Sequence, residues 1–263
     1  MAGRNEWRTA LAYGDRDGVY IRGYDLKELV ENKSFAECFL MLALGDLPGK
    51  GAARVLEAIL VSTLDHGIVP SSTVTRYLAS AGAPIQAAVA GGVLSFGDVY
   101  GGASEQLAQA LHANAPAADG DARLGDAAAA VVAGFAAAGQ RIPGYGHALH
   151  PDGDPRVATL YGIARSEGVA GRFSDLAFAV EDALAETKGR RFPMNQDGAM
   201  AALGLDLGLD WRLIRALAFV PRSAGLAVHA VEEIQREPGW RHVPDAEVAY
   251  DGPGRRSLKG RAE

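Results

Sequence analysis

Apolar residues recur at spacings of three and four along most of this chain, and this periodicity constrains its fold more than any other feature. The same stretches are rich in alanine, leucine, glutamate, arginine and glutamine, which favour helices. Strand-like residues are confined to 11–13 and 19–21, which flank a glycine- and aspartate-rich turn and suit a hairpin. The sequence therefore predicts an all-α protein with a small N-terminal β-hairpin.

Local start and stop signals place many helix ends. Ser34 and Glu37 form a capping box, and Gly45 ends the helix that follows. Further helices are expected over 50–65, from Ser71 or Ser72, from Pro84, over 121–139, from Asp154-Pro155, up to Lys188-Gly189, over 211–220 and from Ser223. In the last helix, Glu232 is expected to pair with Arg236 and His229 with Glu233. The basic, glycine-rich residues 252–263 are expected to form a mobile tail.

Composition excludes several protein classes. The 263 residues suffice for one or two domains, and 48% apolar content is too high for a disordered chain. No apolar run approaches the ~20 residues that cross a bilayer, and the N-terminus lacks a secretory hydrophobic segment. We therefore expect a cytoplasmic protein without membrane association. The single cysteine, Cys38, excludes an internal disulfide framework and a multi-cysteine metal site.

The charge balance bears on possible partners. With 26 basic and 32 acidic residues, the formal net charge is −6. Sequence-independent nucleic-acid binding needs a dense basic face, so no nucleic-acid partner is expected. A local basic cluster could still hold a phosphorylated cofactor.

Glycine and polar residues concentrate in three loops, at 97–105, 142–147 and 192–198, where the backbone can approach a ligand closely. None has the glycine order of a phosphate-binding loop. His147 could act as an acid or base near pH 7, or could simply hydrogen-bond to the backbone. Asp197 stands just before a helical run, where aspartate is most often an N-cap.

Several cationic residues stand near predicted helix ends. A bound carboxylate would explain Arg156 in the first turn of its helix, and so would solvent exposure. His66 is compatible with a C-terminal cap, and Arg222 with a solvated side chain. Lys188, Arg190 and Arg191 form a basic run of the kind that commonly marks an exposed helix end.

Six segments taken together resemble the citrate synthase superfamily. They are RGYDL at 22–26 with the EL and SF pairs that follow, LGDLP at 44–48, DHG at 65–67, GYGHA at 144–148 with DPR at 154–156, NQDG at 195–198 and PRSAG at 221–225. Each is weak alone, but they occur in the family's order. The resemblance implies a large helical domain of residues 1–101 and 216–263, and a small one of residues 102–215. The two would close over the active site of a homodimer.

The resemblance also implies roles for individual residues. His147 would bind the oxaloacetate or citryl oxygen and move its proton, and Asp197 would be the acid or base at the acetyl methyl carbon. The implied substrate-carboxylate ligands are His66, Arg156, Arg222 and, lent across the dimer, Arg241. The implied contacts to coenzyme A are Lys188, Arg190, Arg191, Gly144 and Gly146. The coenzyme A thioester is a substrate, and neither a metal nor a permanently bound cofactor is implied.

Three departures from the family pattern affect the expected activity. Tyr100 replaces a histidine that donates to the thioester oxygen as an enolate forms, and losing such a donor typically costs ~10²–10³ in rate. A neutral tyrosine hydroxyl could donate instead. Pro151 replaces a basic contact to coenzyme A, and a large block is missing between Pro48 and Asp65. A short chain with an aromatic residue before Gly-Gly resembles stand-alone citryl-CoA lyases and the citrate synthase-like module of ATP-citrate lyase.

The resemblance therefore predicts a lyase that cleaves citryl-CoA to acetyl-CoA and oxaloacetate by a retro-Claisen reaction. His147 would remove the tertiary hydroxyl proton, Asp197 would protonate the enolate, and Tyr100 or the following backbone N–H groups would stabilise its oxygen. One alternative is a citrate synthase, an acyltransferase that condenses acetyl-CoA with oxaloacetate. Another is a catalytically inactive family member that binds coenzyme A or regulates a partner. Both reaction directions cross the same enolate-forming transition state, so the sequence leaves the direction open.

Overall fold

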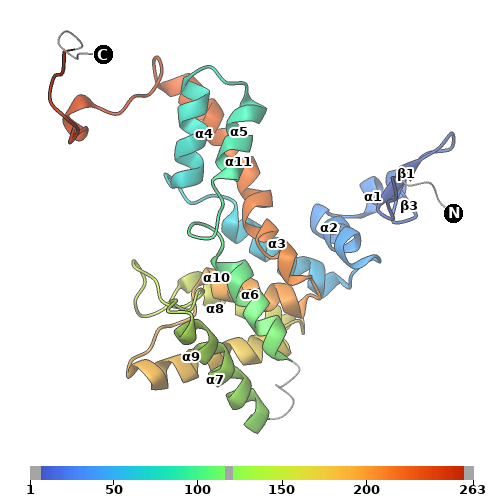
Figure 1. The fold of residues 1–263 in the computed structure, drawn as a ribbon. Helices are drawn as coiled ribbons and strands as arrows, with labels where there is room; N and C mark the ends of the chain where they lie inside the picture. Colours follow the sequence, from blue (N-terminus) through green and yellow to red (C-terminus); the bar gives the residue numbers. More distant parts are fainter. Residues whose placement is uncertain (1–6, 116–120, 258–263) are drawn as a thin grey trace.

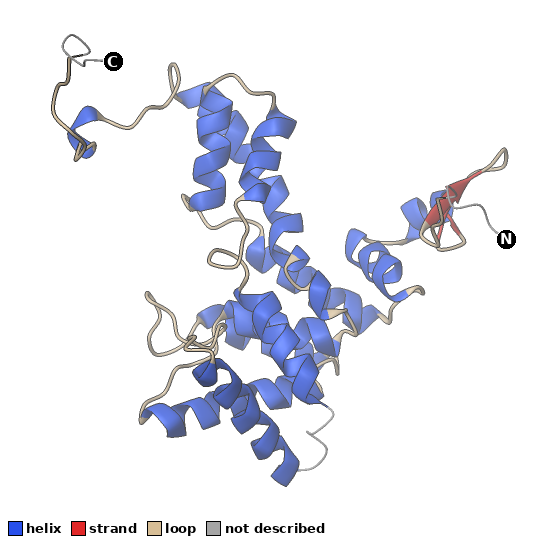
Figure 2. Ribbon diagram, in the orientation of Figure 1, coloured by secondary structure: helices blue, strands red, loops and turns tan. Residues whose placement is uncertain are grey.

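The computed structural model describes residues 7–115 and 121–257, and helices dominate both ranges (Figure 1, Figure 2). The helices are α1 (Leu26–Asn32), α2 (Phe35–Leu44), α3 (Lys50–Thr63), α4 (Pro70–Ser80), α5 (Ile85–Leu94), α6 (Ala103–Asn114), α7 (Asp121–Ala137), α8 (Pro155–Ser166), α9 (Arg172–Lys188), α10 (Gln196–Asp206) and α11 (Ala216–Arg236), with short 3₁₀ turns η2 (Trp211–Leu213) and η3 (Asp245–Glu247). Strands β1 (Ala12–Gly14), β2 (Val19–Ile21) and β3 (Tyr24–Asp25) form one antiparallel sheet in the order β1-β2-β3. The predicted fold class, all-α with a small N-terminal hairpin, is confirmed.

The N-terminal sheet has a third strand that the sequence analysis did not predict. Arg22 (φ 51°) and Gly23 (φ 87°) both adopt left-handed backbone conformations between β2 and β3. This pair of conformations is typical of a two-residue hairpin turn. The Arg22 guanidinium donates from Nε and Nη2 to the Leu42 carbonyl at 3.1 and 2.7 Å, which ties the sheet to the end of α2.

Several predicted helix ends are confirmed. Ser34 and Glu37 form the capping box of α2, and Gly45 ends that helix with φ 95°. Asp154 caps α8, and Gly189 follows the last residue of α9 with φ 68°. Each of these ends depends on side-chain or backbone chemistry within a few residues, which is why the sequence alone predicts them.

Two other helix starts lie one or two residues from the predicted positions. Helix α4 begins at Pro70, before the predicted caps. Ser72 lies inside its first turn, where Oγ accepts the Val69 N–H at 2.9 Å. Pro84 precedes α5 as its N-cap instead of being its first helical residue. Helix α6, for which the sequence analysis named no start, begins at Ala103 within the glycine-rich segment 97–105.

The prediction for residues 211–236 is wrong in one respect. Instead of two helices separated near Pro221, the chain forms the short turn η2 and then the continuous helix α11. Proline lacks the N–H that would bond to the carbonyl four residues earlier, at Leu217. That carbonyl accepts a hydrogen bond from Thr63 Oγ1 of α3 at 2.9 Å instead. A tertiary contact therefore satisfies the group that proline leaves free.

The helices associate in two groups (Figure 1). In one group α4 packs on α5 and α11, and α11 also packs on α5 and α3. In the other group α10 packs on α6, α8 and α9, while α7 packs on α9 and α6. Helix α3 contacts α8 as well as α11 and so links the two groups. The expected domain boundaries fall between α5 and α6 and at the start of α11, and the division into domains stays a prediction.

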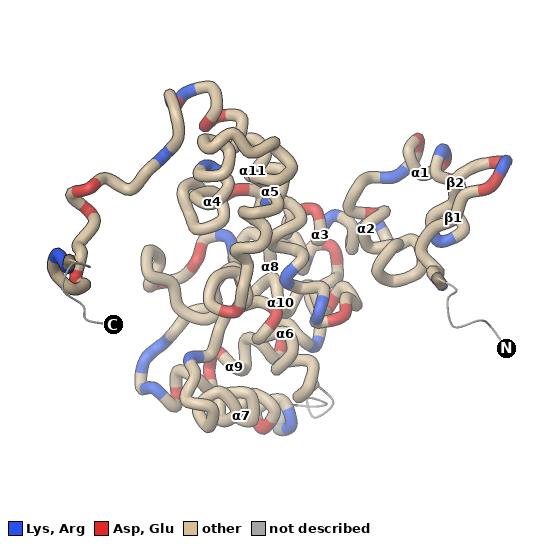
Figure 3. Tube along the Cα trace, turned by 45° about the horizontal axis from the view of Figure 1, so that its top comes forward, with Lys and Arg blue, Asp and Glu red and all other residues tan. Residues whose placement is uncertain are grey.

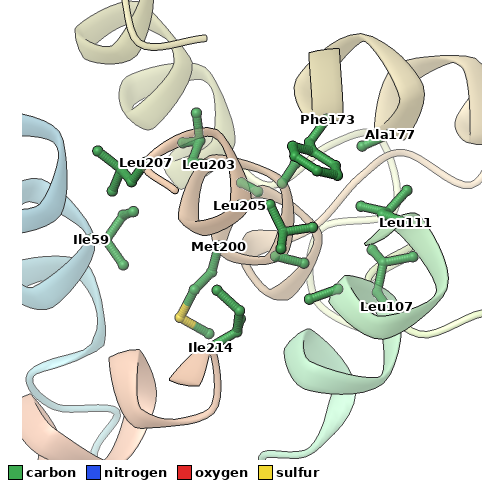
Figure 4. Close-up of a cluster of buried hydrophobic side chains, with 14 of the residues drawn as sticks. Ile59, Leu107, Leu111, Phe173, Ala177, Met200, Leu203, Leu205, Leu207 and Ile214 are labelled. Atoms are coloured by element: carbon green, nitrogen blue, oxygen red, sulfur yellow. The ribbon is translucent and has the colours of Figure 1, made fainter. Parts of the chain in front are cut away.

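Helix α10 lies at the centre of the second group. Figure 4 shows its side chains among apolar residues from neighbouring elements, including Ile59, Leu107, Leu111, Phe173 and Ile214. Residues 198–205 of α10 are all buried, as is Gln196. Because so much of the helix is enclosed, the position of its N-terminal end, where Asp197 lies, is closely defined by the packing.

No helix within the described residues is both long and apolar enough to cross a membrane. Acidic and basic residues are interspersed along the described trace (Figure 3). Within residues 7–115 and 121–257, no three histidine, cysteine, aspartate or glutamate side chains gather where they could hold a metal ion. Residues 1–6 and residues 258–263, the end of the expected mobile tail, lie outside the described part of the chain.

Candidate active site

The loop that carries His147 and the segment before α10 are joined by backbone hydrogen bonds. The Gly146 N–H donates to the Pro193 carbonyl at 2.7 Å, and the Asn195 N–H donates to the Gly144 carbonyl at 2.9 Å. These bonds flank a short antiparallel bridge between the two segments. They hold the His147 loop against the start of α10.

Asn195 completes this connection with its side chain. Its Oδ1 accepts the backbone N–H groups of Asp197 and Gly198 at 2.9 and 3.3 Å, which caps α10. Its Nδ2 donates to the Gly146 carbonyl at 2.8 Å. Asn195, not Asp197, is therefore the N-cap, and the Asp197 carboxylate is not used for capping.

Two glycines allow the loop and the helix to approach this closely. A Cβ added at Gly144 would lie 2.9 Å from the Gly198 Cα, and one added at Gly198 would lie 2.5 Å from the Gly144 carbonyl oxygen. Gly144 (φ 85°) and Gly146 (φ 75°) also adopt left-handed backbone conformations, which glycine tolerates best. Gly144 has a packing role, because it is the buried residue of the loop that lies against Gly198 of α10.

The hydrogen bonds of His147 determine which ring nitrogen carries its hydrogen. Nδ1 accepts the backbone N–H groups of Leu149 at 3.1 Å and His150 at 3.2 Å. A nitrogen that accepts hydrogen bonds is unprotonated, so the neutral ring carries its hydrogen on Nε2. His147 thus presents a donor at Nε2, which differs from the expectation that this ring removes a proton.

Asp197 is half-buried at the first turn of α10. Burial raises the pKa of its carboxyl, and the nearby Asp154 charge raises it further, while Arg156, His147 and His66 act in the opposite direction. Among the described residues, nothing donates a hydrogen bond to this carboxylate. A carboxyl group with a raised pKa and no partner is suited to exchange a proton with a ligand.

Asp154 and Arg156 form a closely bonded pair at the start of α8. The guanidinium donates from Nε to Asp154 Oδ1 at 2.9 Å and from Nη2 to Oδ2 at 2.7 Å. Asp154 is buried, and its Oδ2 also accepts the Gln196 N–H at 3.1 Å. The arginine at this helix start is thus explained by its pairing with the N-cap aspartate, a reason that the sequence analysis did not identify.

Arg222 and His66 lie at the junction of α3 and α11. Arg222 is buried, not solvated, and its Nε donates to the Thr63 carbonyl at 3.0 Å. Desolvation lowers the pKa of His66, and the charges of Arg156, Arg222 and His147 lower it further. The His66 ring is therefore neutral at pH 7. Its electrostatic coupling to three other predicted site residues places it in the same cluster.

The structure thus brings together the side chains of His66, His147, Arg156, Asp197 and Arg222 from four separate segments. The cluster combines two guanidinium groups, two imidazoles and a carboxyl group that has no hydrogen-bond donor. Arginines recognise carboxylates through charge-assisted bonds, and the remaining groups can hold or move protons. The arrangement suits chemistry on a small polycarboxylate.

Tyr100 lies in the loop between α5 and α6, and its side chain contacts the start of α4. Its hydroxyl is 2.9 Å from Ser71 Oγ, and its ring packs 5.2 Å from that of Phe96, measured between centroids. No described contact joins Tyr100 to His147 or Asp197. Its predicted role at the thioester oxygen stays a prediction.

No described contact joins Arg241, Lys188, Arg190 or Arg191 to the cluster. Arg241 binds the buried Glu233 of its own chain at 2.5 and 2.9 Å, beyond the C-terminal end of α11. At the end of α9, the Arg190 guanidinium lies 4.4 Å from the centre of the Phe192 ring, and Arg191 pairs with Glu181 at 2.6 Å. Lys188 occupies the last turn of the same helix.

Sequence reasoning missed how three residues support the cluster. Asp154 was predicted as a helix start but not as the partner of Arg156. Asn195 precedes a helical run, so its capping position was a usable signal. Gln196 donates from Nε2 to the Ser62 carbonyl and to Ser62 Oγ, both at 2.8 Å. No local pattern in the sequence indicates this contact between α10 and α3.

Comparisons with known proteins agree with the arrangement. The family described as "Citrate synthase, C-terminal domain" matches residues 48–242. "Putative citrate synthase 2" of Mycobacterium tuberculosis (strain ATCC 25618 / H37Rv) is 33% identical over 214 residues, which cover 78% of this chain and 52% of the relative. "Citrate synthase" of Haloferax volcanii is 26% identical over 219 residues, covering 81% and 55%. The chain spans about half the length of these curated relatives.

Solved structures show the same likeness. Citryl-CoA lyase from Hydrogenobacter thermophilus superposes with a TM-score of 0.88 and 34% identity, covering 96% of this chain and 97% of the lyase. ATP citrate lyase from Methanothrix soehngenii, in complex with citrate and coenzyme A, has a TM-score of 0.80 and 22% identity. That alignment covers 97% of this chain and 43% of the larger protein, and it shows a shared fold.

Proposed function

The chain belongs to the citrate synthase family. We propose that it is a lyase that cleaves citryl-CoA to acetyl-CoA and oxaloacetate. The observation that carries the proposal is the cluster of His66, His147, Arg156, Asp197 and Arg222. Its carboxyl group, on Asp197, has no hydrogen-bond donor among the described residues and lies near the Arg156 guanidinium and the two imidazoles.

The direction of the reaction rests on two further observations. The lyase from Hydrogenobacter thermophilus matches this chain over nearly the full length of both, whereas the curated citrate synthases are about twice as long as the matched part. Tyr100 also stands where synthases of the family carry a histidine. Both observations favour cleavage over condensation.

Substrate binding follows from the charges of the cluster. Arg156 and Arg222 would hold the carboxylates of the citryl group. The basic residues at the end of α9, Lys188 and Arg190, would contact the phosphates of coenzyme A. The substrates are therefore citryl-CoA in one direction and acetyl-CoA with oxaloacetate in the other.

The chemistry requires one proton to leave the tertiary hydroxyl and one proton to reach the acetyl carbon. His147 donates from Nε2 to the hydroxyl oxygen and stabilises the negative charge that develops there. His66, which is neutral, accepts the hydroxyl proton. The carbon–carbon bond then breaks, and its electron pair forms the enolate of acetyl-CoA. Asp197 transfers a proton to the terminal carbon from its protonated form, whose fraction the raised pKa increases.

Asp197→Ala tests the proposal. Oxaloacetate released from citryl-CoA is followed by its reduction in a coupled assay, and folding is checked by circular dichroism. We expect the variant to fold normally and to release no detectable oxaloacetate, while Asp182→Ala, an exposed position on α9, keeps wild-type turnover. Undiminished turnover by Asp197→Ala would remove the assignment.

Two other outcomes correspond to the alternative functions. Citrate and free coenzyme A formed from acetyl-CoA and oxaloacetate would identify a citrate synthase, which the 33% identity to the Mycobacterium tuberculosis protein favours. Coenzyme A binding without turnover of any citryl thioester would identify an inactive family member. The homodimer and the cytoplasmic location stay predictions.

A further inference from the structure

The turn that carries His66 is held at both ends by side chains. Asp65 Oδ1 accepts the Gly67 N–H at 2.6 Å, and Ser72 Oγ donates to the Gly67 carbonyl at 2.7 Å. Gly67 has a left-handed conformation, with φ 65°. Because His66 lies between these anchors, the direction of its ring depends on where Asp65 is held. Nothing among the described residues hydrogen-bonds to the His66 ring itself.

The other oxygen of Asp65 is bound by a histidine of α11. His229 Nε2 lies 2.9 Å from Asp65 Oδ2, and the His229 side chain is only 11% exposed. On the opposite edge of the ring, Nδ1 accepts a hydrogen bond from Arg76 Nε at 3.1 Å. The neutral ring therefore carries its hydrogen on Nε2 and donates it to Asp65. The predicted pair of His229 with Glu233 is not formed.

A glycine on α11 allows the turn to approach this helix. A Cβ added at Gly225 would lie 2.5 Å from the Leu64 carbonyl oxygen and 2.9 Å from Asp65 Oδ2. His229 follows Gly225 by four residues, so both lie on the same face of the helix. The backbone contact at Gly225 and the hydrogen bond from His229 thus act on one carboxylate.

Arg76 is held in turn by a buried carboxylate. Its Nη1 donates to Glu233 Oε2 at 2.9 Å, and Glu233 is fully buried. Arg241 binds the same carboxylate from the segment after α11. Arg76 also pairs with Glu232. A continuous set of bonds therefore leads from Arg241 through Glu233, Arg76 and His229 to Asp65.

We propose that His229 is a positioning residue of the active site. It holds the Asp65–Gly67 turn through the hydrogen bond from Nε2 to Asp65, and so keeps the His66 ring where it can accept a proton. The Arg76–Glu233–Arg241 cluster keeps the His229 ring in place. This inference rests on the proposed function only in the role that it gives to His66.

The test compares His229→Ala with His229→Gln. A glutamine side chain can accept from Arg76 through its oxygen and donate to Asp65 through its amide group, so it replaces both bonds. We expect His229→Ala to lower kcat for citryl-CoA about tenfold, with KM changed less than about threefold. The His66 ring resonances, identified by their loss in His66→Ala, should move in the alanine variant. In His229→Gln, kcat and the positions of the His66 resonances should both return toward their wild-type values.

A control and a second readout separate positioning from general loss of structure. His112→Ala removes an exposed histidine on α6 and should leave turnover and the His66 resonances unchanged. Circular dichroism provides the folded fraction to which each kcat is normalised. If His229→Ala keeps normalised kcat within twofold of wild type and leaves the His66 resonances unmoved, the proposal is wrong. It is also wrong if His229→Gln is impaired as strongly as the alanine variant.

Failure of the proposed function has a different signature. In that case wild-type protein does not cleave citryl-CoA, and the resonance comparison alone decides whether His229 positions His66. A shift that occurs in His229→Ala and is reversed in His229→Gln still supports the positioning role, and the absence of a shift contradicts it.

Discussion

At the scale of single residues, the surroundings of two neighbouring carboxylates, Asp154 and Asp197, shift their pKa values in opposite directions. Burial raises the pKa of Asp154, but the hydrogen bonds and charge of Arg156 and the Gln196 N–H outweigh it, so this pKa lies below its usual value. Burial likewise raises the pKa of Asp197, and no donor among the described residues compensates it, so its pKa lies above the usual value. The environment therefore keeps one group ionised and prepares the other to exchange a proton.

Ionised Asp197 should lower the stability of the folded protein. A raised pKa in the folded state means that ionisation costs stability, and this cost appears as the pH rises through that pKa. Asp197→Asn should therefore have a higher Tm than wild type at pH 7, and the difference should disappear toward acidic pH, where both side chains are neutral. Activity should fall by about 10²–10⁴.

Thermal melts of both proteins at a series of pH values, followed by circular dichroism, measure this difference. A lower Tm for Asp197→Asn at pH 7 would contradict the interpretation of Asp197 as an ionised group without compensation.

At the scale of elements, the site depends on how closely the His147 loop approaches α10. Gly198→Ala should lower the free energy of unfolding by about 1–3 kcal/mol, because the new Cβ would lie 2.5 Å from the Gly144 carbonyl oxygen and force the two segments apart. Gly134→Ala provides a control in α7, where an added Cβ would meet nothing within 4 Å. That change should raise stability by about 0.5–1 kcal/mol, because alanine favours helices.

Urea denaturation of the two glycine variants compares these effects. The expected changes in the free energy of unfolding have opposite signs. Equal changes in both variants would show that the contact between Gly144 and Gly198 does not limit how closely the loop and the helix approach. Gly198→Ala should also lose most of its turnover, since it displaces Asp197 relative to His147.

Helix α10 caps the start of α9 in the second group of helices. Asp206, the last residue of α10, accepts hydrogen bonds from the N–H groups of Gly171, Phe173 and Ser174 at 2.9–3.0 Å and from Ser174 Oγ at 2.5 Å. Asp206→Ala leaves these donors at the start of α9 without an acceptor. We expect the free energy of unfolding to fall by about 2 kcal/mol.

The same denaturation assay checks this expectation. Asp182→Ala, on the exposed face of α9, should change stability by no more than about 0.5 kcal/mol. An equally small effect of Asp206→Ala would mean that the cap contributes little to the attachment of α9.

At the scale of the whole molecule, α3 connects the two helix groups, and one face of α11 remains uncovered. Val228, Val231 and Ile234 are 69%, 38% and 55% exposed and lie at helical spacing along that face. An exposed row of aliphatic side chains is typical of a surface that associates with another protein. Together with the family resemblance, it supports a second copy of this chain as the partner.

We expect the protein to be a homodimer in solution. Light scattering coupled to size-exclusion chromatography should yield a mass of twice the 27.5 kDa of the chain. Val228→Glu should shift the mass toward that of one chain if the exposed face of α11 is part of the contact. A wild-type mass of 27.5 kDa over a range of protein concentrations would contradict the dimer.

Much of the fold could be predicted because its signals are local. The capping box at Ser34, the left-handed glycine at Gly45 and the cap at Asp154 all act within a few residues. The break expected at Pro221 was wrong because the compensating donor, Thr63, is distant in the sequence. For the same reason, the bond between His229 and Asp65 replaced the expected helical pair with Glu233.

The helical class, most helix ends and the candidate residues for the chemistry could be predicted from the amino-acid sequence, because periodicity, capping and family motifs are contained in short segments. The protonation and hydrogen bonding of those residues depend on the folded arrangement. Among the described residues no donor reaches the Asp197 carboxylate, His147 carries its hydrogen on Nε2, and desolvation and two arginines lower the pKa of His66. Proton affinity and hydrogen-bond direction depend on groups that are close in space, and the chain brings those groups together only when it folds.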